Sequence, residues 1–221
     1  MQKDIVMKNK KYLKIVKSLA DELSIYFHWI NEFNILFPKE ELQYELYNET
    51  APNFFSNLSK FYFDHFFLKI SIMLDPLKMG GFENLSLYQL EKIVSETSPE
   101  KKQEIKKDID LIKDEAKVIL KVRMKIIAHK DLNVTLNKEH LGETKFNEIE
   151  SIITKMGNLI NKVLELLGQP KYSFLWLRDF NGATSLIQSL KQSSYYHDLS
   201  IEPELFDKIE QTEIKSKYYK L

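Results

Sequence analysis

The chain has 221 residues, no cysteine, and equal numbers of basic and acidic side chains, 32 of each. This length fits one large domain or one and a half small domains, and a chain without cysteine has no disulfide or thiolate chemistry. The formal net charge of zero excludes a global field that recruits nucleic acid, so any polyanion has to be bound by a local cluster.

Export and membrane signals are not evident. The first residues, MQKDIVMKNKKYLK, lack the apolar core of a signal peptide. The longest apolar runs fall well short of the ~20 residues that cross a bilayer. We therefore expect a soluble cytoplasmic protein that does not contact a membrane.

Helices are predicted along the whole chain, because apolar residues recur at steps of three and four. The expected helices cover residues 4–36, 39–49, 52–74, 86–95, 97 to about 129, 144–167 and a shorter stretch within 171–193. Strict alternation is confined to the residues around TLN, so no sheet is predicted. The patterns predict an all-α protein, with an up-and-down helical bundle over residues 1–170 and a C-terminal helical extension over 171–221 packed on the bundle.

Two of these helices have distinctive sequences. The helix over residues 52–74 is apolar around most of its circumference, so it has to be buried on more than one side. It forms either the centre of the bundle or part of a subunit interface. The short helix after Asn84 is expected to begin with Ser86 as its N-cap and Gln89 in the capping-box position.

An arginine stands on the apolar stripe of the long central helix. Ile112, Ala116 and Leu120 define the stripe, and Arg123 follows three residues later on the same face. Arginine is rare here, since Arg178 is the only other one. A guanidinium in this place indicates a need for its planar fork of donors, and it has to find an anion or a partner.

His129 follows the arginine by six residues, and Asp131 and Asn133 come next. Aspartate and asparagine favour turns, so the helix is expected to end near the histidine. In an unbroken helix, residue 129 is rotated by roughly 120° from residue 123. Arg123 and His129 therefore converge only if the chain bends between them or if a second subunit contributes one of the two groups.

Other catalytic signatures are missing from the sequence. The five histidines show no i, i+4 pairing and no HExxH motif, so no metal site is predicted. Gly80 and Gly81 lack the lysine of a phosphate-binding loop, and no serine nucleophile elbow is present. We expect no metal and no cofactor, and Arg123 with His129 remains the candidate catalytic pair.

Three blocks in order resemble the AbiU-type abortive-infection branch of the HEPN superfamily, whose signature is an arginine, four to six residues, and a histidine. Here five residues intervene between Arg123 and His129. The likeness covers about residues 25–170. Its blocks are LYNETAPNFFSNL, DHFFLKISIMLDPLKMGGFENLSLYQL and KVRMKIIAHKDLNV.

The resemblance implies a HEPN-like bundle that cleaves or binds RNA without a metal, in phage defence or a toxin-antitoxin system. It further implies a homodimer in which two Arg/His motifs meet across the two-fold axis, and a possible antitoxin partner. Arg123 and His129 are then the catalytic residues. Asp75, Asp131 and Asn133 are possible supporting polar groups, although Asp75 also fits a helix-ending Asp-Pro turn.

Two further interpretations remain open at this stage. Many active members have a polar residue directly after the arginine, where this chain has Met124. A non-catalytic member that binds RNA or a partner protein is therefore the alternative to a ribonuclease. A helical scaffold that only dimerises through residues 52–74 is the other interpretation.

Overall fold

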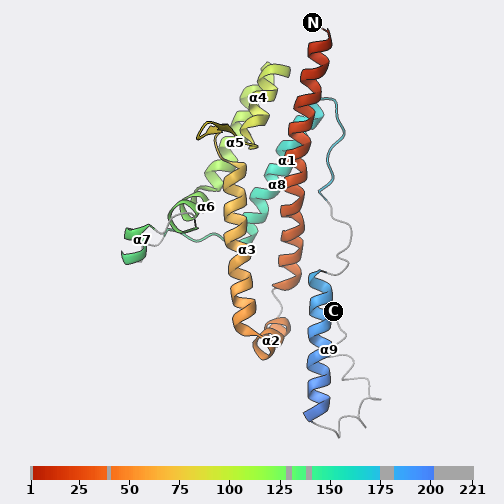
Figure 1. The fold of residues 1–221 in the computed structure, drawn as a ribbon, viewed down its shortest axis with the longest axis vertical. Coiled ribbons are helices and arrows are strands. Elements are labelled where there is room, and N and C mark those ends of the chain that lie inside the picture. Colours follow the sequence, from red (N-terminus) through yellow and green to blue (C-terminus); the bar gives the residue numbers. More distant parts are fainter. Residues whose placement is uncertain (1, 39–40, 128–130, 138–140, 175–181, 202–221) are drawn as a thin grey trace. The chain divides into compact units, whose positions relative to one another are not determined.

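The computed structural model describes residues 2–38, 41–127, 131–137, 141–174 and 182–201, and helices make up nearly all of them (Figure 1). The α-helices are α1 (Gln2–Leu36), α2 (Glu41–Thr50), α3 (Pro52–Met73), α4 (Tyr88–Thr97), α5 (Lys102–Glu115), α6 (Lys117–Val122), α7 (Leu132–Asn137), α8 (Phe146–Leu166) and α9 (Ala183–Ile201). A 3₁₀ turn, η1 (Pro99–Lys101), and a π-helical turn, η2 (Arg123–Ile127), complete the helical elements. The predicted all-α fold is confirmed.

The chain falls into two compact units, each made of two stretches of sequence. The first contains residues 1–30 and 62–176, and the second contains residues 31–61 and 177–221. Both units are discontinuous because α1 and α3 each contribute to both. The sequence led us to expect a different division, into a bundle over residues 1–170 and an extension over residues 171–221. That division stays a prediction.

The core of the first unit is aliphatic and comes from all of its long helices. Its fully buried side chains include Leu19, Leu23, Phe66, Ile70, Leu87, Leu90, Ile93, Ile105, Ile109 and Ile119. On α8, the predicted apolar stripe is buried along the whole helix. Burial of apolar area at about 25 cal/mol per Å² is the main force that holds these helices together.

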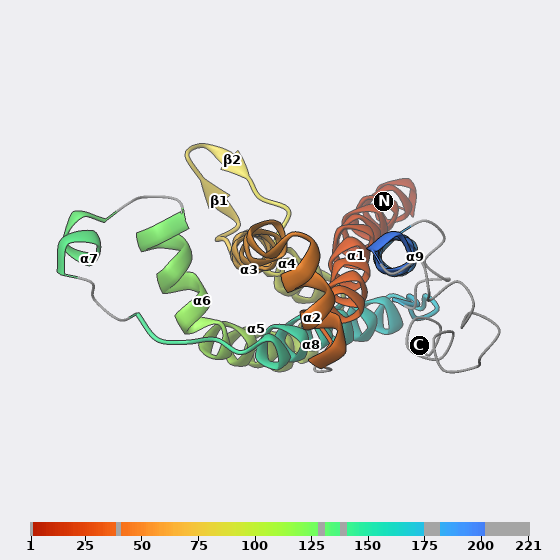
Figure 2. The same ribbon diagram turned by 90° about the horizontal axis from the view of Figure 1, so that it is seen from below.

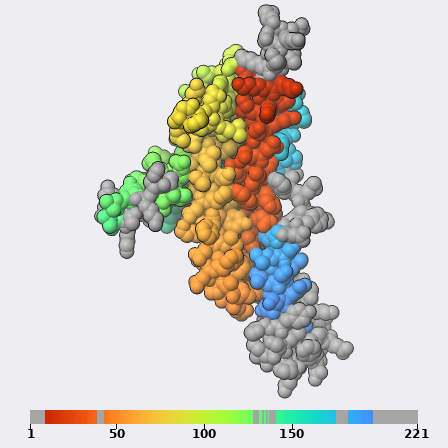
Figure 3. All heavy atoms as spheres, viewed as in Figure 1, coloured from red at the N-terminus to blue at the C-terminus, as the bar shows by residue number. Residues whose placement is uncertain are grey.

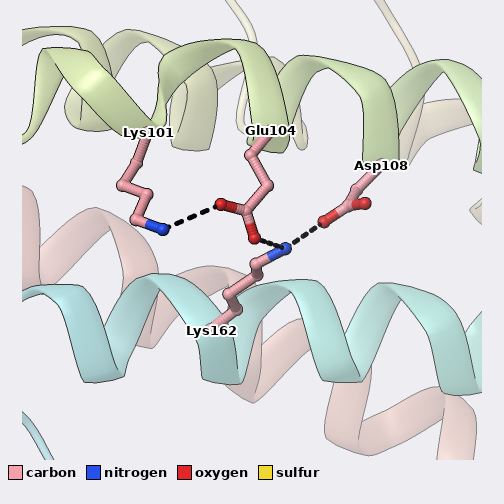
Figure 4. A network of polar contacts seen from close by, with 4 residues as sticks. All are labelled: Lys101, Glu104, Asp108 and Lys162. Atoms are coloured by element: carbon pink, nitrogen blue, oxygen red, sulfur yellow. Dashed lines mark hydrogen bonds and ion pairs between the residues drawn. The ribbon is translucent and has the colours of Figure 1, made fainter.

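Helices α5 and α8 run antiparallel, and charged side chains link them along their length (Figure 4). Lys162 of α8 lies between Glu104 and Asp108 of α5, with Nζ to oxygen distances of 2.6 and 2.7 Å. Two turns further along α5 and back along α8, Lys155 pairs with Glu115. These contacts fix the register of α5, and α5 leads directly into the segment that contains Arg123. Figure 2 shows the pair from below.

Burial and hydrogen bonding shift the pKa of Lys162 in opposite directions. Partial burial acts to lower the pKa of Lys162, but hydrogen bonds to Asp108 and Glu104 outweigh it, so the pKa is raised. The pKa of Glu104 is lowered by its hydrogen bonds to Lys162 and Lys101. Because these groups are largely exposed, the pairs specify register more than they add stability.

A small hairpin and the start of α4 differ from the sequence-based expectation. Strands β1 (Lys78–Met79) and β2 (Phe82–Glu83) form an antiparallel pair, although no sheet was predicted. Gly80 and Gly81 both have positive φ, which a two-residue hairpin turn requires and glycine adopts freely. The predicted capping by Ser86 is wrong, since its Oγ has no hydrogen-bond partner among the described residues and Leu87 precedes α4 instead.

Buried polar side chains close the end of α1 in the second unit. The Gln43 amide nitrogen donates to the carbonyl oxygens of Ile35 and Leu36 at 2.8 and 3.0 Å. The Tyr47 hydroxyl donates to the Leu36 oxygen at 2.5 Å. Burial raises the pKa of Tyr47 to about 12, so its hydroxyl remains a donor at neutral pH. These bonds satisfy carbonyl groups that a helix end leaves free.

The chain after α8 turns back onto the first unit. Gly168 has φ +69°, its N–H donates to Glu165 O, and the Gln169 N–H donates to Leu164 O, both at 2.9 Å. This is a Schellman cap. Tyr172 then exchanges two hydrogen bonds with the Asn161 amide, so residues beyond the cap are fastened to α8.

None of the described helices is both long enough and apolar enough to cross a bilayer.

Replacing Gly168 tests the cap. No atom lies within 4 Å of the place that a Cβ would take, so Gly168→Ala introduces backbone strain alone. We expect a loss of about 1–2 kcal/mol in the free energy of unfolding, measured with urea. Gly168→Asn should lose less, because asparagine tolerates a positive φ. Equal losses for the two variants would contradict this account.

Candidate functional site

The central helix is interrupted twice before it reaches the predicted histidine. α5 ends at Glu115, Ala116 has φ −78° and ψ 3°, and α6 continues to Val122. The π-helical turn η2 then begins at Arg123. One helix was expected from residue 97 to about residue 129, so the break at Ala116 corrects that expectation, whereas a bend after Arg123 was one of its two alternatives. No glycine or proline marks either interruption, and Ala116 is fully buried, so the sequence has no local signal for them.

Arg123 occupies the first position of the π turn, and its side chain is half-buried. Its Nε is buried and has no hydrogen-bond partner among the described residues. A buried donor without an acceptor costs free energy, about 1–3 kcal/mol and more when the group is charged. The sequence predicted that this guanidinium needs an anion or a partner, and none of the described residues supplies an acceptor to its Nε.

The π turn changes where the residues after Arg123 point. Its hydrogen bonds run from i to i+5, so each turn holds more residues than an α-helical turn. The angular spacing of the side chains over residues 123–127 therefore differs from that of a regular α-helix. Irregular turns of this type occur frequently at functional sites. His129 lies outside the described residues, and its approach to Arg123 remains a prediction.

Asp131 has a local structural role after the gap. Its Oδ1 accepts a hydrogen bond from the Val134 N–H at 3.1 Å, which makes it the N-cap of α7. Its own N–H donates to the Lys125 carbonyl oxygen at 2.9 Å. The start of α7 is thus tied to the π turn, and the two flank the position of His129.

The other two predicted supporting residues are placed only in part. Asp75 lies two residues after the end of α3, and its N–H donates to the Ile72 carbonyl oxygen at 3.2 Å, which fits the helix-ending role. Asn133 is within α7, and its side chain lies outside what the structure describes. Both remain candidates by sequence alone.

Exposed aliphatic side chains surround this segment, which sequence reasoning did not predict. The exposed fractions are 53% for Met124, 47% for Ile126, 69% for Leu132 and 69% for Leu136. Leu132 and Leu136 are one turn apart, so they share a face of α7. The signal in the sequence was the high apolar content on both sides of Arg123. In Figures 1 and 3, α7 stands away from α4, α5 and α8.

The same segment is locally positive. From residue 117 to residue 141 the only acidic side chains are Asp131 and Glu139. Its basic side chains are Lys117, Lys121, Arg123, Lys125, Lys130 and Lys138. The chain is neutral overall, so this basic segment is one candidate for the local cluster that polyanion binding requires.

His65 is a second histidine with an unusual environment. Its ring meets the Trp29 ring edge-on, with centroids 4.0 Å apart, and its Nε2 is buried without a hydrogen-bond partner in the described chain. Burial, and then the charge of Lys69, lower its pKa below the usual 6.5. A neutral ring packed between α1 and α3 is a structural group.

A protein-family model described as AbiU2, of the HEPN type, matches residues 9–180. The chain belongs to the AbiU2 family. No curated protein and no solved structure is similar enough to match. The match includes the π turn, α7 and the Arg123–His129 spacing, so the AbiU2 assignment covers the whole candidate site. Among the described residues, no group of three or more histidine, aspartate or glutamate side chains is placed to hold a metal ion.

Asp131 can be tested as a cap. Asp131→Ala should destabilise α7 by about 0.5–2 kcal/mol, the usual cost of losing an N-cap. Asp131→Asn keeps an oxygen acceptor and should leave α7 intact. Hydrogen exchange of the amides of residues 132–137 reports the difference, and equally fast exchange in both variants would show that capping is not what the carboxylate does.

His65 makes stability depend on pH. Its folded-state pKa lies below its unfolded value of 6.5, so the unfolded chain binds more protons between the two values. The contribution of the neutral ring is complete above pH 6.5 and is lost as the pH falls through the folded pKa. His65→Gln should flatten this part of the stability curve, measured by urea unfolding from pH 7.5 to about pH 5. An unchanged slope would disprove the linkage.

Proposed function

We propose that this AbiU2 protein is a metal-independent endoribonuclease of a phage-defence or toxin-antitoxin system, with Arg123 and His129 as its catalytic residues. The observation that carries the proposal is Arg123, a half-buried guanidinium with a buried Nε that lacks an acceptor, at the start of a π turn. The spacing to His129 matches the signature of the superfamily, and the family model spans both residues.

RNA supplies its own nucleophile in this reaction. The ribose 2′-oxygen attacks the adjacent phosphorus as a base removes the 2′-hydroxyl proton, and the bond from phosphorus to the 5′-oxygen breaks. The leaving 5′-oxygen takes up a proton. The products are a 2′,3′-cyclic phosphate and a free 5′-hydroxyl, so no metal, water or cofactor is consumed.

Arginine and histidine divide the catalytic work. The Arg123 guanidinium can offer two parallel donors to the phosphate and stabilise the charge that builds on its oxygens. Histidine exchanges protons near neutral pH, which typically contributes ~10²- to 10⁴-fold. In a homodimer with both motifs at the two-fold axis, one His129 accepts the 2′-proton and the other donates a proton to the 5′-oxygen.

The surroundings of Arg123 support a site that is completed by a second copy of the chain. Met124, Ile126, Leu132 and Leu136 are exposed aliphatic side chains on the segment that contains the arginine. Interface cores are enriched in apolar residues, and an isologous interface uses the same patch on both chains. The homodimer is therefore proposed to form through α6, η2 and α7.

A non-catalytic AbiU2 protein that binds RNA or a partner protein is the second candidate function. It is favoured by Met124, which is exposed next to the arginine where a polar group would assist phosphate binding. An antitoxin protein is one such partner. Binding of RNA without cleavage over a panel of single-stranded and structured RNAs would favour this function.

Cleavage in EDTA tests the ribonuclease. The wild-type chain should cut RNA and leave 2′,3′-cyclic phosphate ends, and His129→Ala should lower the rate by ~10²- to 10⁴-fold because the proton carrier is gone. Arg123→Lys should also lower the rate, since lysine cannot offer two parallel donors.

His197→Ala is the matched control, because it lies beyond the residues that the family model matches. It should cut RNA like the wild type. Thermal unfolding establishes that each variant is folded. Undiminished cutting by folded His129→Ala would remove the catalytic assignment.

A further inference from the structure

The segment with exposed aliphatic side chains is also the positively charged one. Leu132 and Leu136 project from α7, and Met124 and Ile126 belong to the π turn. Lys117 is exposed on the same short stretch of chain, and residues 117–141 hold six basic and two acidic side chains. The aliphatic groups favour association with an apolar surface, whereas the net positive charge opposes association with any surface of the same sign.

A two-fold axis through this segment brings like charges together. In an isologous interface each patch faces its own copy, so the basic residues of one chain approach those of the other. Such repulsion acts over a Debye length of ~10 Å at 0.1 M salt and ~3 Å at 1 M. A second chain alone therefore meets attraction from the aliphatic side chains and repulsion from the charges.

The aliphatic patch is small for a stable dimer. Specific interfaces bury about 800 Å² on each partner and use about 20–30 residues a side. Four exposed aliphatic side chains are a minor part of such an area. The repulsion between the basic side chains of the two copies therefore still affects how tightly the chains pair. A phosphate backbone between the two chains replaces this repulsion with attraction.

We infer that pairing of two chains through α6, η2 and α7 is coupled to RNA binding, so that RNA drives assembly of the site on which it is cut. This inference rests on the proposed two-fold site. Its physical content is a linkage: whatever increases the affinity of the dimer for RNA increases, by the same factor, the affinity of the chains for each other. Cleaved RNA that leaves the site then lets the chains separate.

Sedimentation equilibrium of the full chain measures the linkage. The probe is an oligoribonucleotide with 2′-O-methyl groups, which keeps every phosphate and lacks the nucleophile. Without it, raising KCl from about 0.05 to 0.5 M should tighten dimerisation, because salt screens repulsion. With it at low salt, dimerisation should tighten by about 5- to 150-fold, and adding KCl should now weaken the dimer, because salt competes for phosphate contacts.

Variants separate the two contributions. The double variant Leu132→Ser and Leu136→Ser should weaken dimerisation with and without the oligonucleotide. Lys117→Gln removes an exposed charge and should tighten the dimer without RNA while lowering the gain from RNA. Phe82→Ser, on the exposed hairpin, is the matched apolar control and should change neither.

The outcomes distinguish this inference from the proposed ribonuclease. A dimer whose affinity ignores the oligonucleotide, or weakens with salt in its absence, overturns the coupling even when the wild-type chain cuts RNA. A chain that cuts no RNA, yet dimerises more tightly on the oligonucleotide, overturns the catalytic proposal and retains the coupling. A monomer under every condition overturns the coupling.

Discussion

The guanidinium of Arg123 is the constraint on which the candidate site depends. Its Nε is withdrawn from water without an acceptor in the described chain, and its helix unwinds into a π turn at that residue. A group held in this way is destabilising in the isolated chain. In the proposed function a phosphate supplies the missing acceptor, and the structure around the arginine explains how it is kept in place.

The packing of α5 against α8 determines where the segment with Arg123 begins. The Lys162 contacts with Glu104 and Asp108 set the register of α5 against α8, and buried Ile109 and Ile112 supply most of the adhesion. Ala116 changes the direction of the chain, so α6 and the π turn leave the bundle where α5 ends. A rigid helix pair thus carries a less regular segment, which is a common arrangement for binding and catalytic residues.

The sequence predicted the helices well because their signals are local. Apolar residues at steps of three and four located the core faces of α5 and α8, and the expected helix over residues 144–167 agrees with α8, Phe146–Leu166. The hairpin was missed because two-residue strands are too short for an alternating pattern. The break at Ala116 was missed because no glycine or proline stands there to announce it.

The candidate site was predictable only in part, because residue spacing is visible in the sequence whereas side-chain contacts and exposure depend on the fold. The spacing of Arg123 and His129 is readable in a single chain, and both residues lie within the part of the chain that the family model matches. The capping role of Asp131 emerged only from its bond to the Val134 N–H, and the exposed faces of Met124 and Leu132 only from the fold. Contacts made by a second chain leave no periodic signal, so the dimer cannot be read from spacing.

The chain contains no cysteine, so a single introduced thiol reports on one place in the assembly. The most direct measurement is crosslinking of Met124→Cys by a short bismaleimide in the presence of the 2′-O-methyl oligonucleotide. Leu111→Cys, exposed on α5, is the matched control. The account predicts a covalent dimer for Met124→Cys and none for Leu111→Cys. A crosslink at Leu111→Cys alone, or at neither site, would contradict the claim that two copies bring their Arg123 segments together on RNA.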